Sequence, residues 1–321
     1  MTKKILLLSG DPNSINSEII YKSWKKLSLS LKKQLYLIGS FKLLKAQFKK
    51  LRYPLKLIKV KNIKEKTKSN HLKIIDIDIK FNKPFNVPQK NRSKFIQESL
   101  NLAHHLAEKK EVLGIINCAI DKKLLGKKNT GVTEYLASKC KVKNHSEVML
   151  IRNKKLSVIP ITTHIDIKQI SRKITLTKIV NKVKIAESWF KDHFNTKPKI
   201  GILGLNPHNA ELRKGSEENN IIIPAIKKLK ILKTKIKGPL IADTLFINDY
   251  KNFDIIIGMF HDQILAPFKA IFKFNAINIT LGLKYLRASP DHGTANNLIG
   301  KKKAKAESLL ECINFVNKFG K

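Results

Sequence analysis

Short runs of apolar residues alternate with longer amphipathic stretches along most of the chain. The apolar runs of strand length lie at 4–8, 35–38, 112–119, 199–205 and 255–257. Apolar residues at helical spacing fill 41–51, 93–109 and 304–319. Buried parallel strands give continuous apolar runs, and their alternation with helices is typical of a doubly wound α/β sheet. The pattern therefore predicts an α/β protein.

Three further stretches refine this prediction. Residues 148–151 and 156–159 are separated by a polar turn and are expected to form a hairpin. Residues 74–79 alternate Ile with Asp, which is typical of an edge strand. Residues 168–193 are expected to form one long helix before Pro198. A chain of 321 residues is at the size where one core begins to divide. Because no flexible linker is evident, we expect one large α/β unit or two subdomains that share an interface.

The charge of the chain is extreme, but it does not change the class of protein that the pattern predicts. The formal net charge is +40, which would ordinarily suggest a nucleic-acid or membrane partner. Only six of the 64 basic residues are Arg, and the Lys are spread along the whole chain. We therefore expect no specific nucleic acid as a partner. Three Cys without metal or redox spacing, and no apolar run long enough to cross a bilayer, favour a cytoplasmic protein without a membrane partner.

Candidate chemistry is concentrated between residues 254 and 300. The apolar run 255–257 leads into His261 and Asp262, at the place where buried strands end and ligands are usually bound. Lys269, Asn278 and Arg287 follow. Arg offers a planar fork for phosphate or carboxylate, and Lys offers a point charge. Together these residue types suit an anionic substrate and a metal ion.

Three of the nine His residues come just after apolar runs that read as strands. They are His164, His208 and His261, separated by 44 and 53 residues. Neutral imidazole is a common ligand of zinc and similar cations, and three of them leave open positions for substrate oxygens. Each His alone is as well explained by a structural role, so both interpretations stay open at this point.

A series of motifs spans nearly the whole chain in one order. The chain contains Gly10-Asp11-Pro12, Gly131-Val132-Thr133-Glu134, Thr162-Thr163-His164, Leu205-Asn206-Pro207-His208, Ala242-Asp243-Thr244-Leu245-Phe246, Met259-Phe260-His261-Asp262-Gln263 and Asp291-His292-Gly293-Thr294-Ala295. This series resembles the 4-hydroxythreonine-4-phosphate dehydrogenase family of pyridoxal phosphate biosynthesis. The resemblance implies NAD- or NADP-dependent oxidation of 4-phosphohydroxy-L-threonine, followed by decarboxylation to 3-amino-2-oxopropyl phosphate.

The resemblance also implies a fold and an assembly. The fold would be the three-layer α/β/α fold of isocitrate and isopropylmalate dehydrogenases, with two subdomains around a central cleft. We expect residues 1–130 and 265–321 to form the first subdomain, and residues 131–264 to form the second with the dimer interface. A homodimer with a shared active site is implied. This fold would explain why the chain lacks the Gly-x-Gly-x-x-Gly fingerprint of a Rossmann dehydrogenase.

Site residues carry over by position. His164, His208 and His261 would bind one divalent ion (zinc, cobalt or magnesium), with one of them reaching in from the partner subunit. The substrate contacts would be Thr133, Lys269, Asn278 and Arg287. Asp243 and Asp262 are candidates for proton handling or for orienting the His ligands. Lys122, the residue kept from a Gly-Pro-x-His-Lys stretch of the family, is a third catalytic candidate.

Some positions depart from the family pattern. Val132 stands where the family has a substrate-binding His, and an apolar side chain donates no hydrogen bond. The first loop, 13–17, lacks two glycines of the family, as does the loop after His208. The alternatives are a dehydrogenase of erythronate or threonate 4-phosphate, a catalytically inactive relative kept as an interaction module and, from charge alone, a nucleic-acid-binding protein.

Overall fold

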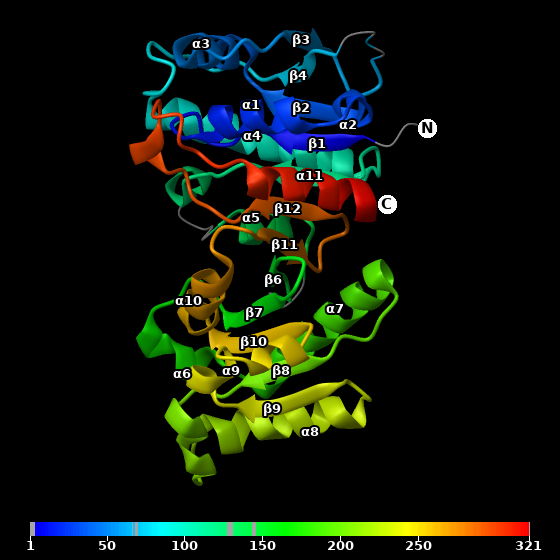
Figure 1. Ribbon diagram of the computed structural model, residues 1–321, viewed down its shortest axis with the longest axis vertical. Helices are drawn as coiled ribbons and strands as arrows, with labels where there is room; N and C mark the ends of the chain where they lie inside the picture. Colours follow the sequence, from blue (N-terminus) through cyan, green and yellow to red (C-terminus); the bar gives the residue numbers. More distant parts are fainter. Residues whose placement is uncertain (1–3, 66, 68–69, 127–130, 143–145, 321) are drawn as a thin grey trace. The chain divides into compact units, whose positions relative to one another are not determined.

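The computed structural model describes residues 4–65, 67, 70–126, 131–142 and 146–320. Two compact units make up the chain (Figure 1). Unit 1 comprises residues 1–141 and 283–321, and unit 2 comprises residues 142–282. This division differs from the expected subdomain boundaries, because residues 131–141 lie in unit 1 and residues 265–282 lie in unit 2.

The described residues of unit 1 form six strands in the order β3-β4-β2-β1-β5-β12. Every neighbouring pair is parallel. The strands are β1 (Ile5–Leu8), β2 (Leu35–Gly39), β3 (Leu57–Val60), β4 (Leu72–Asp76), β5 (Gly114–Asn117) and β12 (Arg287–Pro290). The expectation of an edge strand at 74–79 is wrong, because β3 pairs with the outer side of β4. The run 57–60 is short and only half-buried, so its apolar pattern did not reveal a strand.

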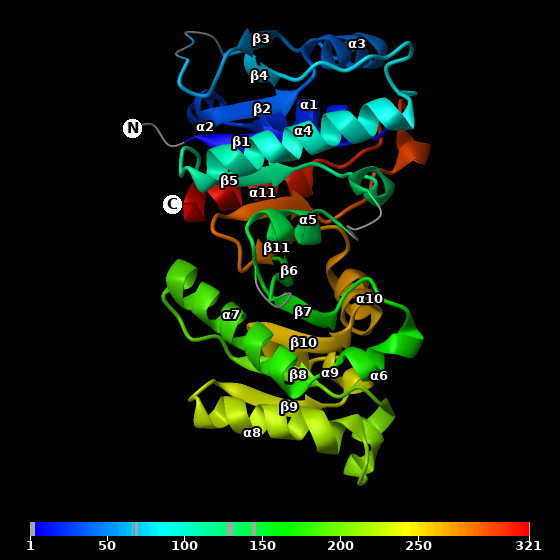
Figure 2. The same cartoon turned by 180° about the vertical axis from the view of Figure 1, so that it is seen from behind.

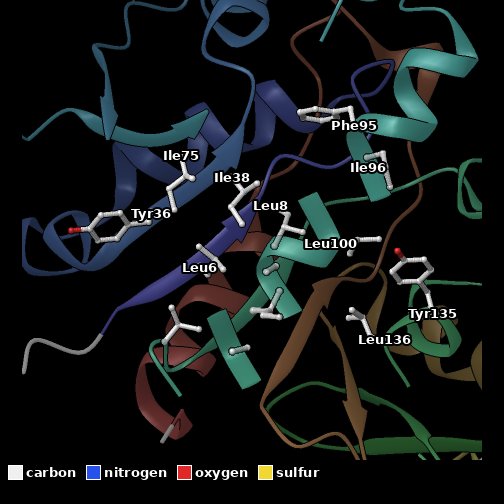
Figure 3. Close-up of a cluster of buried hydrophobic side chains, with 14 of the residues drawn as sticks. Leu6, Leu8, Tyr36, Ile38, Ile75, Phe95, Ile96, Leu100, Tyr135 and Leu136 are labelled. Carbon is white, nitrogen blue, oxygen red and sulfur yellow. The ribbon is translucent and has the colours of Figure 1, made fainter. Parts of the chain in front are cut away.

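Helices cover both faces of the unit 1 sheet. Helix α4 packs on β1, β2 and β5, while α11 packs on β1, β5 and β12 from the opposite side (Figures 1 and 2). Helix α1 packs on α3 and α11. Figure 3 shows Phe95, Ile96 and Leu100 of α4 within the same buried cluster as Leu6 and Leu8 of β1. The helices are α1 (Asn16–Lys26), α2 (Leu29–Gln34), α3 (Phe41–Leu51), α4 (Gln89–Glu108), α5 (Val132–Lys139) and α11 (Glu307–Phe319).

In the part of unit 2 that the structure describes, six strands follow the order β11-β6-β7-β10-β8-β9. Strands β7, β10, β8 and β9 are parallel neighbours, whereas β6 is antiparallel to both β7 and β11. The expected hairpin is confirmed, since β6 and β7 pair through Ile151 and Val158. The strands are β6 (Val148–Arg152), β7 (Ser157–Thr162), β8 (Ile200–Leu203), β9 (Ile236–Leu240), β10 (Ile255–Phe260) and β11 (Ile277–Leu281).

The helices of unit 2 also form two layers. Helix α10 packs on β7 and β10, and α7 packs on β6, β7 and β11 from the other side (Figures 1 and 2). The prediction of a single helix at 168–193 is wrong. It is broken at Ile174, which is extended, and Thr175 caps a new helix by accepting a hydrogen bond from Lys178 N. The helices are α6 (Ile170–Lys173), α7 (Leu176–Phe194), α8 (Ile223–Ile231), α9 (Ala242–Leu245) and α10 (His261–Phe272). Among the described residues, no helix has the length and apolar character needed to cross a membrane.

Candidate active site

Two of the three predicted metal-binding histidines meet at the carboxyl ends of neighbouring strands in unit 2. Strands β7 and β10 are parallel, and their last residues, Thr162 and Phe260, are register partners. His261 follows β10 directly and opens α10, while His164 lies two residues beyond β7. The centroids of the two imidazole rings are 5.7 Å apart. Residues separated by nearly a hundred positions are therefore neighbours because their strands pair.

This spacing suits a shared cation. Two imidazoles bound to one tetrahedral zinc ion, at about 2.0–2.1 Å from each nitrogen, have ring centroids about 5 Å apart. His261 Nδ1 lies 2.6 Å from Asp262 Oδ1. Because an ionised carboxylate only accepts hydrogen bonds, Nδ1 carries the proton and Nε2 keeps its lone pair for a ligand. A carboxylate behind a ligating imidazole is the usual way to fix its tautomer.

His208 lies in a different local setting. It belongs to the turn Pro207–Leu212 that follows β8, and its side chain is exposed. Residues 208–212 all have φ between 45° and 58°, so the chain runs left-handed there without a glycine. Across the described part of the chain, no three His, Cys, Asp or Glu side chains are placed to hold one metal ion. The structure thus brings His164 and His261 together, and a three-histidine site remains a prediction.

The other unit 2 candidates occupy separate elements. Lys269 is half-buried on α10, with its Nζ 6.0 Å from the Phe274 ring centroid. Asn278 lies on β11 opposite Ile151, and its Oδ1 is buried without a hydrogen-bond partner among the described residues. A buried acceptor left unsatisfied costs free energy, which a ligand donor would recover. Asp243 is exposed in the first turn of α9.

In unit 1 the structure builds a cationic centre around Arg287. Arg287 opens β12 opposite Ile115 of β5, so its side chain reaches Asn117, two residues along the same face of that strand. The buried guanidinium donates from Nε to Asn117 Oδ1 at 2.7 Å and from Nη1 to Thr133 Oγ1 at 3.4 Å. Burial lowers the pKa of Arg287 to about 10, while the nearby Cys312, Glu134 and Tyr285 act in the opposite direction. Arg287 therefore stays charged at neutral pH, and a buried cation of this kind favours an anionic ligand.

Two more positions of unit 1 bear on the site. Val132 is the first residue of α5, and its side chain packs against the hydrophobic core of the unit. Thr133 follows it and accepts the hydrogen bond from Arg287, so the fold brings together two residues that the resemblance implies as substrate contacts, and that role stays a prediction. Lys122 is exposed in a 3-10 turn, Lys122–Leu125, in which the Lys123 amide donates a hydrogen bond to Asp121 Oδ1. The role of Lys122 stays a prediction.

Unit 1 also has a basic pocket of about 380 Å³. Its charged residues are Lys50, Arg52 and Lys302, and its apolar walls include Phe85 and Ile299. None of the residues that line it is acidic. Three cations beside an aromatic ring suit a ligand that carries both a phosphate group and a planar ring.

Three functional candidates escaped the sequence interpretation. Asn117 holds Arg287, and only its place at the end of an apolar run could have drawn attention to it. Gln263 lies in the Met259-Phe260-His261-Asp262-Gln263 motif, but the sequence alone does not predict its hydrogen bonds to the backbone of Met259 and Gly204. Glu218 is fully buried and accepts hydrogen bonds from the amides of Leu205 and Asn206. Nothing in the sequence pairs a helix-region Glu with a loop more than ten residues before it.

Comparison with known proteins decides the family. A family model described as "Pyridoxal phosphate biosynthetic protein PdxA" matches residues 31–316. The chain belongs to this family. The resemblance noted in the sequence motifs is thereby confirmed.

Relatives of similar length carry two related names. A 4-hydroxythreonine-4-phosphate dehydrogenase from Sulfurihydrogenibium sp. (strain YO3AOP1) is 38% identical over 318 residues, which cover 97% of this chain and 96% of the relative. A protein named putative D-threonate 4-phosphate dehydrogenase, from Oceanobacillus iheyensis, is 32% identical and is matched over 98% of this chain and 97% of its own. Relatives of this chain are therefore named for two different substrates, 4-hydroxythreonine 4-phosphate and D-threonate 4-phosphate.

Solved structures agree with the expected fold. The crystal structure of 4-hydroxythreonine-4-phosphate dehydrogenase from Klebsiella pneumoniae superposes with a TM-score of 0.85, at 28% identity, over 99% of this chain and 100% of that one. Isocitrate dehydrogenase from Methylococcus capsulatus matches with a TM-score of 0.50 at 12% identity, covering 98% of this chain and 84% of that one. The prediction of an isocitrate dehydrogenase-like α/β/α fold is confirmed.

Proposed function

We propose that this chain is a 4-hydroxythreonine-4-phosphate dehydrogenase that acts in pyridoxal phosphate biosynthesis. It oxidises the 3-hydroxyl of 4-phosphohydroxy-L-threonine with NAD or NADP, and the resulting β-keto acid loses carbon dioxide to give 3-amino-2-oxopropyl phosphate. The observation that carries this proposal is the His164 and His261 pair, 5.7 Å apart and backed by Asp262, in a chain of this family.

His164 and His261 hold the divalent ion in this proposal, with His208 as the third ligand and one of the three supplied across a homodimer. When bound, the ion supplies a Lewis acid that lowers the pKa of a hydroxyl group and polarises a ketone. Asp262 would keep the Nε2 lone pair of His261 available by accepting a hydrogen bond from Nδ1–H. The fit rests on the donor chemistry, since imidazoles at this spacing accept zinc or cobalt readily and magnesium least.

Each unit carries predicted substrate-binding residues. In unit 1, Arg287 and Thr133 bind the phosphate, because a buried guanidinium with a neighbouring hydroxyl offers charge and hydrogen bonds together. Lys122 adds a second positive charge. In unit 2, Lys269 and Asn278 bind polar groups of the substrate, and a ligand donor would satisfy Asn278 Oδ1.

Proton transfer needs a group that can accept the hydroxyl proton. Asp243 is an exposed carboxylate on the short helix α9 and is our candidate for this role. Asp262 acts through His261 and is a positioning residue rather than a base. Asp243 is exposed and would contact the substrate, whereas Asp262 contacts the imidazole of His261.

The basic pocket of unit 1 is our candidate for the anionic part of the dinucleotide. It is lined by residues 299, 300 and 302, which lie four to seven residues after the end of the Asp291-His292-Gly293-Thr294-Ala295 motif. Replacing Arg52 by Gln should raise the KM for the dinucleotide several-fold and leave the KM for the phosphorylated acid unchanged. An unchanged KM for the dinucleotide would contradict this placement.

We place the enzyme in the cytoplasm as a homodimer with a small phosphorylated substrate. The three Cys residues support the compartment, since Cys118, Cys140 and Cys312 are all buried free thiols. The homodimer follows from the resemblance, and sedimentation of the purified protein tests it.

A substrate screen tests the proposed activity. Purified protein is incubated with NAD or NADP, a divalent ion and one of three acids: 4-phosphohydroxythreonine, threonate 4-phosphate or erythronate 4-phosphate. We expect absorbance of reduced nicotinamide with 4-phosphohydroxythreonine and none after a chelator. No absorbance change with any of the three acids would overturn the enzyme assignment.

One residue favours a second candidate substrate. Val132 packs its side chain on the core instead of presenting a donor at the start of α5. Losing a hydrogen bond to a charged group costs about 1.5–3 kcal/mol, which is enough to change substrate preference. The second candidate is therefore threonate or erythronate 4-phosphate, and a higher kcat/KM for either acid than for 4-phosphohydroxythreonine would select it.

A further inference from the structure

One side chain bridges two strand ends of unit 2 that carry predicted metal ligands. Gln263 is the third residue of α10. Its Oε1 accepts a hydrogen bond from Met259 N at 2.7 Å, near the end of β10. Its Nε2 donates to Gly204 O at 2.7 Å, directly after β8. The same amide thus contacts the chain two residues before His261 and four residues before His208.

The bridge acts where backbone pairing has stopped. Strands β8 and β10 are paired through Ile257 and Ile202, the last register partners between them. Beyond that point β10 leads into α10, and β8 leads into the turn Pro207–Leu212. Gln263 therefore links the segments after β8 and β10 by side-chain hydrogen bonds, beyond the last backbone pairing of the two strands.

A second bond extends the bridge to the strand that carries His164. Thr162 Oγ1 donates to Met259 O at 2.7 Å. The backbone of Met259 is thus held on both sides, by Gln263 at its amide and by Thr162 at its carbonyl. Each of the three predicted ligands follows one of these anchored residues within four positions.

The packing around the bridge leaves little freedom for it to shift. A Cβ added to Gly204 would lie 2.1 Å from Asn209 Oδ1, and Asn209 in turn donates from Nδ2 to Pro239 O at 3.1 Å. A Cβ on Gly258 would lie 3.1 Å from Gln263 Oε1. Gly204 therefore leaves room for the Asn209 side chain, and Gly258 leaves room for Gln263, so a side chain added at either position would disturb the surroundings of the bridge.

We propose that Gln263 is a positioning residue, which with Thr162 sets the spacing of the strand ends that carry His164, His208 and His261. The proposal rests on the proposed function, because it concerns the affinity of that site for its divalent ion. Gln263 does not ligate the ion. It fixes where the imidazoles begin, as partners beyond the ligands do in metal sites.

Cobalt binding by the purified full-length chain tests the proposal without any turnover. The variants are Gln263→Leu, which removes both bonds at similar volume, and Thr162→Val, which removes the hydroxyl alone. Titration calorimetry gives the dissociation constant for Co²⁺, and the visible absorption of bound cobalt reports its coordination. We expect roughly 10- to 100-fold weaker binding for Gln263→Leu, with an altered spectrum, and a smaller change of the same sign for Thr162→Val.

Gln47→Leu is the matched control for general loss of stability. Gln47 is a buried Gln of unit 1 whose Nε2 bonds to Pro12 O at 2.9 Å and to Pro84 O at 2.7 Å. This variant should lower the urea midpoint without changing cobalt affinity. Wild-type affinity in both Gln263→Leu and Thr162→Val would overturn the proposal, as would an equal loss of affinity in Gln47→Leu.

A further variant separates this proposal from the proposed function. His261→Ala should abolish the cobalt spectrum if the proposed metal site is correct. A wild-type spectrum that survives His261→Ala contradicts the metal site itself, and the role of Gln263 falls with it. A His261-dependent spectrum that is unchanged in Gln263→Leu overturns the role of Gln263 alone.

Discussion

The hydrogen bond between Asn117 and Arg287 gives a prediction that can be worked through in energy. Both side chains are buried, and Arg287 Nε donates to Asn117 Oδ1 at 2.7 Å. Replacing Asn117 by Leu keeps the volume but removes the acceptor. A hydrogen bond to a charged group contributes about 1.5–3 kcal/mol, and the buried guanidinium keeps its charge because its pKa is still about 10. We expect the free energy of unfolding to fall by this amount.

The same change should reach substrate binding, because the guanidinium loses one of the contacts that aim it. If the full 1.5–3 kcal/mol appeared in binding, the KM for the phosphorylated acid would rise by about 10- to 150-fold. Arg287 also contacts Thr133, so we expect the lower part of that range. The value of kcat should change less than KM.

Urea unfolding and steady-state kinetics measure the two effects. The control is Asn117→Asp, which keeps an oxygen acceptor beside the cation and should retain more stability than Asn117→Leu. A second comparison is Thr133→Val, which removes a longer contact of 3.4 Å and should cost less stability than Asn117→Leu. The reasoning is refuted if Asn117→Leu unfolds at the wild-type urea concentration with an unchanged KM.

Three other predictions follow from single residues. Burial lowers the pKa of Lys73 to about 8, so between pH 8 and pH 10 this side chain binds fewer protons in the folded chain than in the unfolded chain. The free energy of unfolding should therefore rise by about 2 kcal/mol from pH 8 to pH 10. Urea titrations of Lys73→Met should lose this rise. Glu211 is exposed and has a φ of 45°, a conformation that glycine adopts with less strain than other residues. Glu211→Gly should therefore raise the free energy of unfolding by about 1 kcal/mol in urea titrations. Glu211→Gln, which keeps a side chain at the same φ, should not. Val132→His restores the residue that the family resemblance implies, so it should lower the KM for 4-phosphohydroxythreonine relative to threonate 4-phosphate, and an unchanged ratio in the absorbance assay would show that position 132 does not select the substrate.

The sequence predicted those elements whose pattern is set by local physics. The helix expected at 41–51 is α3 with the same bounds, because apolar residues recur on one face and Ser40 caps its first turn. The strands expected at 4–8 and 255–257 from uninterrupted apolar runs are β1 and β10, and both are buried. The helix at 168–193 failed at Ile174 and Thr175, where a capping hydroxyl started a new helix that apolar spacing alone did not reveal.

The site was harder to predict because strand pairing assembles it. His164 and His261 are neighbours because β7 and β10 are parallel in one register, and nothing in their separation along the chain encodes that register. The same holds for Arg287 and Asn117, which meet through the β5 and β12 pair. The motifs singled out the candidate residues, but only the fold shows that Asn117 contacts Arg287 and that Gln263 bridges the ends of β8 and β10.

The central claim is that His164 and His261 share one divalent cation. Crystals of the wild-type protein grown with zinc, and measured at the zinc absorption edge, test it directly through the anomalous difference map. The account predicts a peak within about 2.0–2.1 Å of His261 Nε2 and bonded also to His164. A fully ordered site without a peak between these two rings, or a peak bonded to neither of them, would contradict it.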